Sequence, residues 1–138
     1  MALLVLFSHI IRFMLRRVSG LFKSIMNTPR SIINKPLTDT REYRVITLPN
    51  KLEALLISDP NADKSAAAMD VAVGSLFDPP QWQGLAHFLE HMLFLGTRKF
   101  PAEDAYPSYL AKHGGMSNAF TADNHTCYFF SVAPDHLE

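Results

Sequence analysis

Residues 84–95, Gly-Leu-Ala-His-Phe-Leu-Glu-His-Met-Leu-Phe-Leu, carry both the strongest fold signal and the strongest chemical signal in the chain. The stretch is apolar at most positions and is followed by Gly96, which predicts a helix that ends there. At about 100° per residue, His87, Glu90 and His91 lie within about 100° of one another on that helix. Two imidazoles and one carboxylate therefore point the same way, as a metal with two nitrogen ligands and a neighbouring base requires.

The order His-x-x-Glu-His is the reverse of the His-Glu-x-x-His signature of zinc peptidases. The alternative is a buried helix with two core histidines and an unrelated surface glutamate. A core helix has little reason to place a carboxylate between two histidines, however, because an unpaired buried charge is costly. We therefore predict a Zn²⁺ site in which His87 and His91 are the metal ligands and Glu90 is the catalytic base beside a metal-activated water.

The composition is that of a single globular domain, with 138 residues, 48% of them hydrophobic, and a formal net charge of zero. Residues 1–38 hold six Lys or Arg and no Asp or Glu, whereas residues 39–138 hold seven basic and thirteen acidic residues. The basic side chains thus gather outside the part predicted to fold, which argues against nucleic-acid binding. Cys127 is the only cysteine, so no intrachain disulfide can form, and no base is fixed beside it to make it a nucleophile.

Residues 1–40 are predicted to be a basic extension and linker that precede a folded domain at 41–138. On a helical wheel, residues 1–26 have a basic face without acidic residues and an apolar face opposite. This pattern is typical of a mitochondrial presequence, with an untargeted extension, a surface helix or a mis-assigned start as alternatives. The apolar run at residues 1–7 is too short to span a bilayer, so no transmembrane segment is expected.

The hydrophobic pattern of residues 41–138 changes between the strand period and the helix period. Strands are predicted at 42–48, 52–58, 66–75, 117–122 and 126–132. Helices are predicted at 84–95 and 102–113, with a further helix start at Pro134. Pro107 lies inside the second helix and should kink it or delay its start. We therefore expect an α+β fold, a mostly antiparallel sheet with helices packed on one face.

Several further motifs make this segment similar to a known family. They lie at residues 41–44, 56–60, 63–65, 74–76, 78–80, 92–97, 99–101 and 117–121. With these motifs and the His-x-x-Glu-His order, residues 41–138 resemble the N-terminal part of the insulinase and pitrilysin family of inverted-zincin metallopeptidases. The resemblance implies a zinc metalloendopeptidase of the insulinase type that hydrolyses peptide bonds in small peptides.

In that family the third zinc ligand is a glutamate roughly seventy residues beyond the second histidine, on another helix. Only 47 residues follow His91, so this chain does not contain that position and is expected to be a truncated fragment of the metallopeptidase domain. By residue type, His113, Asp123 and His125 could substitute for the glutamate. Each of the three is more often a surface or turn residue.

The resemblance also implies a substrate-binding segment at Asn118, Ala119 and Phe120. There the family pairs the backbone of an extended peptide with an exposed sheet edge, although a plain strand with a core phenylalanine would give the same pattern. The implied partners are peptide substrates and homologous domains of the same enzyme. The implied location is intracellular, in the cytosol by family or in the mitochondrion from the basic N-terminus.

Two alternative functions remain open. A mitochondrial processing peptidase agrees with the basic N-terminus but not with the motifs at residues 99–121. A non-catalytic module would fold or associate with a full-length homologue without cleaving any peptide. Intact residues at 87, 90 and 91 favour descent from an active enzyme, but they leave the activity of this chain undetermined.

Overall fold

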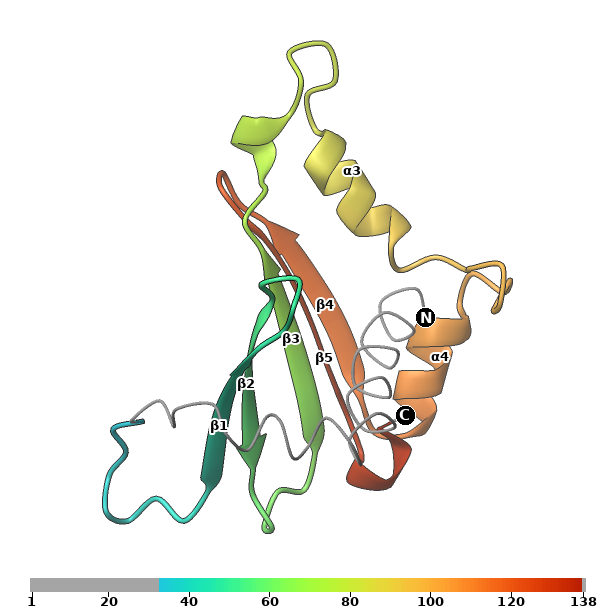
Figure 1. Cartoon of the computed structure of the whole chain (residues 1–138). Helices are drawn as coiled ribbons and strands as arrows, with labels where there is room; N and C mark the ends of the chain where they lie inside the picture. The colour runs from blue at the N-terminus through green and yellow to red at the C-terminus, as the bar shows by residue number, and fades with distance from the viewer. Residues whose placement is uncertain (1–32, 138) are drawn as a thin grey trace. The chain divides into compact units, whose positions relative to one another are not determined.

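The computed structural model describes residues 33–137, which form two compact units, 33–62 and 63–137. The predicted basic helix at residues 1–26 lies outside the described residues. The elements, in chain order, are the strands β1 (Glu42–Thr47), β2 (Glu53–Ser58) and β3 (Ser65–Val71), the 3₁₀ helix η1 (Ser75–Phe77), the helices α3 (Leu85–Met92) and α4 (Ala105–Lys112), the strands β4 (Met116–Thr121) and β5 (Thr126–Val132), and the 3₁₀ helix η2 (Pro134–His136) (Figure 1). All strand pairings among them are antiparallel, which agrees with the mostly antiparallel arrangement that was predicted.

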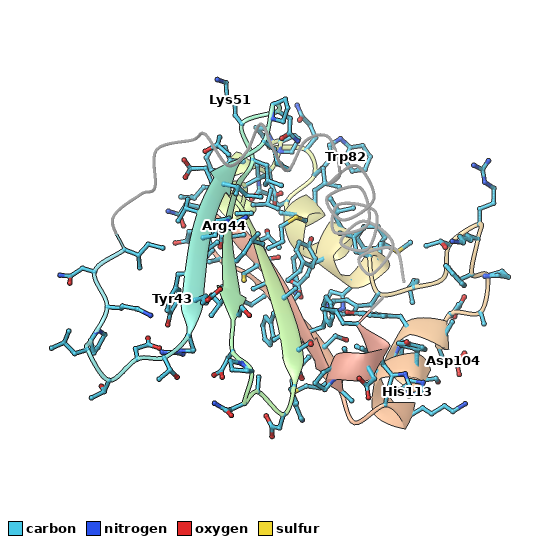
Figure 2. All side chains as sticks on the ribbon, turned by 60° about the horizontal axis from the view of Figure 1, so that its bottom comes forward. Tyr43, Arg44, Lys51, Trp82, Asp104 and His113 are labelled. Carbon is cyan, nitrogen blue, oxygen red and sulfur yellow. The ribbon has the colours of Figure 1, made fainter. Side chains whose placement is uncertain are left out.

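The unit at 33–62 is a hairpin of β1 and β2. The two strands pair along their whole length, with Glu42 opposite Ser58. They are joined at the predicted turn after Pro49, where Lys51 has a left-handed φ of 69° and stands at the tip of the hairpin (Figure 2). Within the described residues this hairpin is a two-stranded sheet of its own, whereas the sequence pattern predicted one sheet.

Contacts just before β1 bind the end of the predicted linker to the hairpin. The Asp39 carboxylate accepts hydrogen bonds from the Arg41 guanidinium at 2.9 Å and from the Tyr43 hydroxyl at 2.7 Å. These bonds hold the pKa of Asp39 well below its usual range. The boundary predicted after residue 40 therefore falls inside a network of side chains that spans it.

The unit at 63–137 is a three-stranded sheet in the order β3-β5-β4 with α3 and α4 on the same side of it (Figure 1). Alternate residues of the central strand β5 are buried, beginning with Thr126, because one face of the sheet meets the helices. The core consists of Tyr106 and Leu110 from α4 and of Tyr128, Phe130 and Val132 from β5. This layer of helices on one face of an antiparallel sheet confirms the α+β prediction.

Strand β3 is shorter than the strand predicted at residues 66–75. It ends at Val71, because the next segment turns to bond the hairpin between β4 and β5. The backbone N–H groups of Ser75 and Leu76 donate to the carbonyls of Ala122 and Asp123 at 3.0 and 2.9 Å. These long-range bonds hold η1, and with it the start of α3, against the end of the sheet.

The second helix starts late, as Pro107 requires. The proline lies in the first turn of α4, where a backbone N–H has no intrahelical partner, so its missing donor has no effect. The helix ends at the predicted Gly114-Gly115 pair: Gly114 has a φ of 66° and Gly115 donates its N–H to Leu110 at 2.7 Å. None of the helices within residues 33–137 has the length and hydropathy needed to cross a bilayer.

Candidate metal centre

The candidate site lies on α3, a helix that is fixed at its start by a remote carboxylate. Gly84 occupies the N-cap position and has no side chain to satisfy the first N–H groups. Asp78 takes that role, because its two carboxylate oxygens accept the N–H groups of Gly84 at 2.7 Å and Ala86 at 2.9 Å. A negative charge at this end also complements the helix dipole. The first turn of the helix is thereby fixed, one turn before Glu90.

The two histidines present their ring nitrogens to each other. His87 and His91 are exposed, and their Nε2 atoms lie 3.0 Å apart with the ring planes tilted by 54°. Two imidazoles on a tetrahedral zinc ion at the usual Zn–N distances have their nitrogens about 3.3 Å apart. Moving the two rings apart by a few tenths of an ångström would therefore admit the ion. The predicted pair has the donor type and spacing that zinc needs.

Glu90 occupies a different environment from the histidines. Its side chain is 7% exposed, and it is the only buried residue of α3. Its Oε2 accepts a hydrogen bond of 2.6 Å from the Thr121 hydroxyl of β4. Behind Thr121, the buried Thr126 hydroxyl donates to the carbonyl of Val73 at 2.8 Å. Neither threonine was predicted as a site residue, although Thr121 shares the inward face of β4 with Ala119, where a hydroxyl needs a polar partner.

Ligand atoms of His87, Glu90 and His91 all lie within 4.8 Å of one another, and within residues 33–137 no other histidine, cysteine or acidic group forms such a set of three. The possible substitutes for a third ligand are elsewhere. His113 lies at the end of α4 (Figure 2), where its ring stacks on that of His136 at 3.6 Å. Asp123 and His125 lie in the β4–β5 turn and do not join the group.

The predicted substrate-binding segment lies on β4, an edge strand of the three-stranded sheet. Asn118 and Phe120 are exposed on one face of β4, whereas Ala119 packs against the core on the other. The N–H of Ala122 donates to the carbonyl of His125, so the antiparallel alternation directs the N–H and C=O of Ala119 away from β5. The Asn118 side chain accepts that N–H at 2.9 Å.

Two neighbouring groups on β5 have raised pKa values. Burial raises the pKa of the Cys127 thiol, and the charge of Asp70 raises it further, so the thiol stays protonated and is a poor nucleophile. Burial also raises the pKa of Tyr128, with a smaller contribution from the negative charge of Glu90. The site therefore has no competing cysteine nucleophile on this sheet.

Comparisons with known proteins agree with this geometry. The sequence profile described as "Insulinase (Peptidase family M16)" matches residues 53–138. The chain is 60% identical over 103 residues to the A-factor-processing enzyme of Saccharomyces cerevisiae and 57% identical over 106 residues to the insulin-degrading enzyme of Homo sapiens. These matches cover 75% and 77% of this chain but 10% of each enzyme, so the chain spans about a tenth of the length of these relatives.

The fold is also found in a solved structure. A crystal structure of pitrilysin matches 75% of this chain and 11% of its own, with a TM-score of 0.70 and 47% sequence identity. The fold, the paired histidines and the family profile all lead to one assignment. The chain belongs to the insulinase family of peptidases, peptidase family M16.

Proposed function

We propose that the chain acts within a zinc metalloendopeptidase of the insulin-degrading type, with His87 and His91 as zinc ligands and Glu90 as the general base. The observation that carries this proposal is the 3.0 Å approach of the two Nε2 atoms beside a buried carboxylate. Neutral imidazoles are preferred ligands of zinc. When bound, the metal supplies Lewis acidity, which polarises a carbonyl and acidifies water.

The two oxygens of the Glu90 carboxylate have different roles in the proposed reaction. Oε2 of Glu90 is occupied by the Thr121 hydroxyl, so Oε1 is the oxygen that is open to a water molecule. In the proposed reaction, Oε1 takes a proton as water attacks the peptide carbonyl and then delivers it to the leaving amine nitrogen. The imidazoles of His87 and His91 are exposed, so a peptide can reach their ring nitrogens from solvent.

The proposed substrate is an extended peptide that adds to the free edge of β4. Asn118, Ala119 and Phe120 would bind it mainly through the backbone, a mode that gives little sequence preference. The outward N–H and C=O of Ala119 support this assignment, because an edge strand offers such groups to a partner strand. Binding there would displace the Asn118 side chain from the Ala119 N–H.

We propose that the site is completed by residues beyond those described. Within residues 33–137 two histidines converge, whereas a catalytic zinc usually has three protein ligands. A homologous domain or a full-length homologue could supply the third, and the exposed apolar side chains of α3 support such an association; they are Leu85, Phe88, Leu89 and Met92. Without that partner the chain would be a non-catalytic module.

We propose that the protein is located in the cytosol. The mitochondrion is the alternative, and it depends on residues 1–26.

Zinc titration of the purified chain tests the assignment of roles. We expect weak zinc binding in the wild type, retained in Glu90→Gln because the base is not a ligand, and lost in His91→Ala. His113→Ala serves as the control, since it removes a histidine from outside the site, and should bind as the wild type does. Loss of zinc in a folded Glu90→Gln chain would make Glu90 a ligand and contradict the proposed roles.

A peptide-cleavage assay with the same proteins tests completeness. We expect no hydrolysis by the zinc-loaded chain alone, because two ligands do not hold the metal as tightly as three. Tight, stoichiometric zinc with chelator-sensitive cleavage would instead show that a second copy, or a residue such as His125, completes the site.

A further inference from the structure

The buried carboxylate of Glu90 could serve either as a base or as a third metal ligand. Its potential ligand oxygen lies within 4.8 Å of the nitrogens of His87 and His91, so distance alone does not exclude ligation. The three residues differ in what fixes them, however. The two histidines are exposed, whereas Glu90 is bonded to the neighbouring strand through Thr121 at 2.6 Å.

The direction of this hydrogen bond follows from the neighbouring hydroxyl. Thr126 has a single hydroxyl proton, which it donates to the Val73 carbonyl at 2.8 Å. The oxygen of Thr126 lies 3.5 Å from that of Thr121, which is long for a hydrogen bond between hydroxyls. The Thr121 proton is therefore directed to Glu90, where the short distance is typical of a bond to an ionised carboxylate.

The bond joins two ordered elements, the helix α3 and the strand β4, across 31 residues of sequence. Ligation of a metal through Oε2 would compete with this bond for the same oxygen, and ligation through Oε1 would require the carboxylate to turn away from Thr121. Both elements are anchored independently, α3 by the Asp78 cap and β4 by its pairing with β5. The carboxylate consequently cannot swing toward the imidazoles without losing a donor in a buried site.

We propose that Thr121 is a positioning residue that holds Glu90 as the base and keeps it out of the ligand set of the metal. This inference rests on the proposed function, because it assumes that His87 and His91 bind a metal. It assigns no contact between Thr121 and the substrate. Its action is exerted entirely through the orientation of one carboxylate.

Cobalt titration of the purified chain tests the inference, because the visible absorption of Co²⁺ reports the number and kind of its ligands. Thr121→Val removes the hydroxyl at nearly constant shape and should free Glu90 to ligate. We expect a changed cobalt spectrum and binding tighter by about tenfold, because the carboxylate adds a third ligand to the two imidazoles. Thr121→Ser keeps the hydroxyl and should behave as the wild type. The double variant with Glu90→Gln should lose the gain in affinity.

Thr47→Val is the matched control, since Thr47 is an exposed threonine at the end of β1 in the other sheet. A folded Thr121→Val chain with the spectrum and affinity of the wild type would overturn the inference. If that variant does not fold, Glu90→Gln alone decides, because an unchanged cobalt spectrum supports exclusion of the carboxylate and a changed one overturns it. Failure of the proposed function is distinguishable, since cobalt binding would then be absent or insensitive to His91→Ala.

Discussion

At the residue scale, the candidate site separates two exposed histidines from a buried carboxylate. His87 and His91 are exposed, whereas Glu90 is 7% exposed and needs a donor because a buried charge without one is unfavourable. The Thr121 hydroxyl supplies it through a bond of the charge-assisted kind, which contributes about 1.5–3 kcal/mol net. An exposed pair of histidines and a shielded carboxylate thus arise on one face of one helix.

The stability of the fold is expected to depend on pH through His113, whose ring stacks on that of His136. Burial lowers the pKa of His113 below its ordinary 6.5, and positive charge on His136 and Lys112 lowers it further. The unfolded chain therefore binds a proton at a higher pH than the folded chain does. Stability from this group is complete above about pH 6.5 and is lost as the pH falls toward the folded pKa.

The variant His113→Phe tests this dependence, because it keeps an aromatic ring against His136 but cannot titrate. We expect its melting temperature to fall less than that of the wild type between about pH 7.5 and pH 5.5. Thermal melts followed by circular dichroism across this range would measure the difference. An equally steep decline in both proteins would show that His113 does not contribute to acid sensitivity.

At the element scale, helix ends are fixed by the surroundings of each helix. α3 is capped by Asp78, which lies outside the helix, and α4 closes on Gly114 and Gly115 against β5. Glycine is required at these two positions for different structural reasons. Gly114 has a φ of 66° with open space around it, whereas a Cβ on Gly115 would lie 2.2 Å from the carbonyl oxygen of Ser131.

The two glycines give a matched pair of substitutions. Gly115→Ala should lower the free energy of unfolding by about 3 kcal/mol or more, because the backbone of β5 must move away from the new methyl group. Gly114→Ala should lower it by about 1 kcal/mol, the usual penalty of a left-handed φ outside glycine. Urea denaturation of both variants measures the order. A larger loss at Gly114 would mean that the contact with Ser131 relaxes easily.

At the scale of the whole molecule, much apolar surface of the described residues is open to solvent. Trp82 is 67% exposed, Phe88 62% and Leu76 75%, all in or just before α3. Apolar surface of this extent usually marks an interaction site. The chain is 57–60% identical to relatives of which it spans 10% of the length. This apolar surface therefore supports the proposal that the chain associates with homologous domains.

Removing the N-terminal extension tests the predicted domain organisation. Residues 1–40 are predicted to precede the folded domain, and the contacts of Asp39 with Arg41 and Tyr43 place the safe cut before residue 39. We expect a chain that begins at residue 33 to melt at the temperature of the full chain. A fall of many degrees on differential scanning calorimetry would show that the extension packs on the domain.

The local features of this protein follow from its sequence. The spacing of His87, Glu90 and His91 places them on one helix face, and this requires only the helix period. The Gly114-Gly115 helix end and the delayed start at Pro107 also follow from local backbone rules, since each involves residues within one or two turns. Strand β5 has its predicted bounds because its β-branched and aromatic residues run from Thr126 to Val132 without a Gly, Pro, Asn or Asp.

Tertiary structure decided which of these local features come into contact. The Thr121–Glu90 bond, the Asp78 cap and the division of the strands into two sheets join residues whose proximity depends on packing. No periodicity could reveal that the carboxylate would be buried while both histidines stay exposed, because burial depends on which strand covers the helix. The sequence by itself determined which side chains share a face, and the packing of α3 on β4 decided which of them is shielded and held by a hydrogen bond.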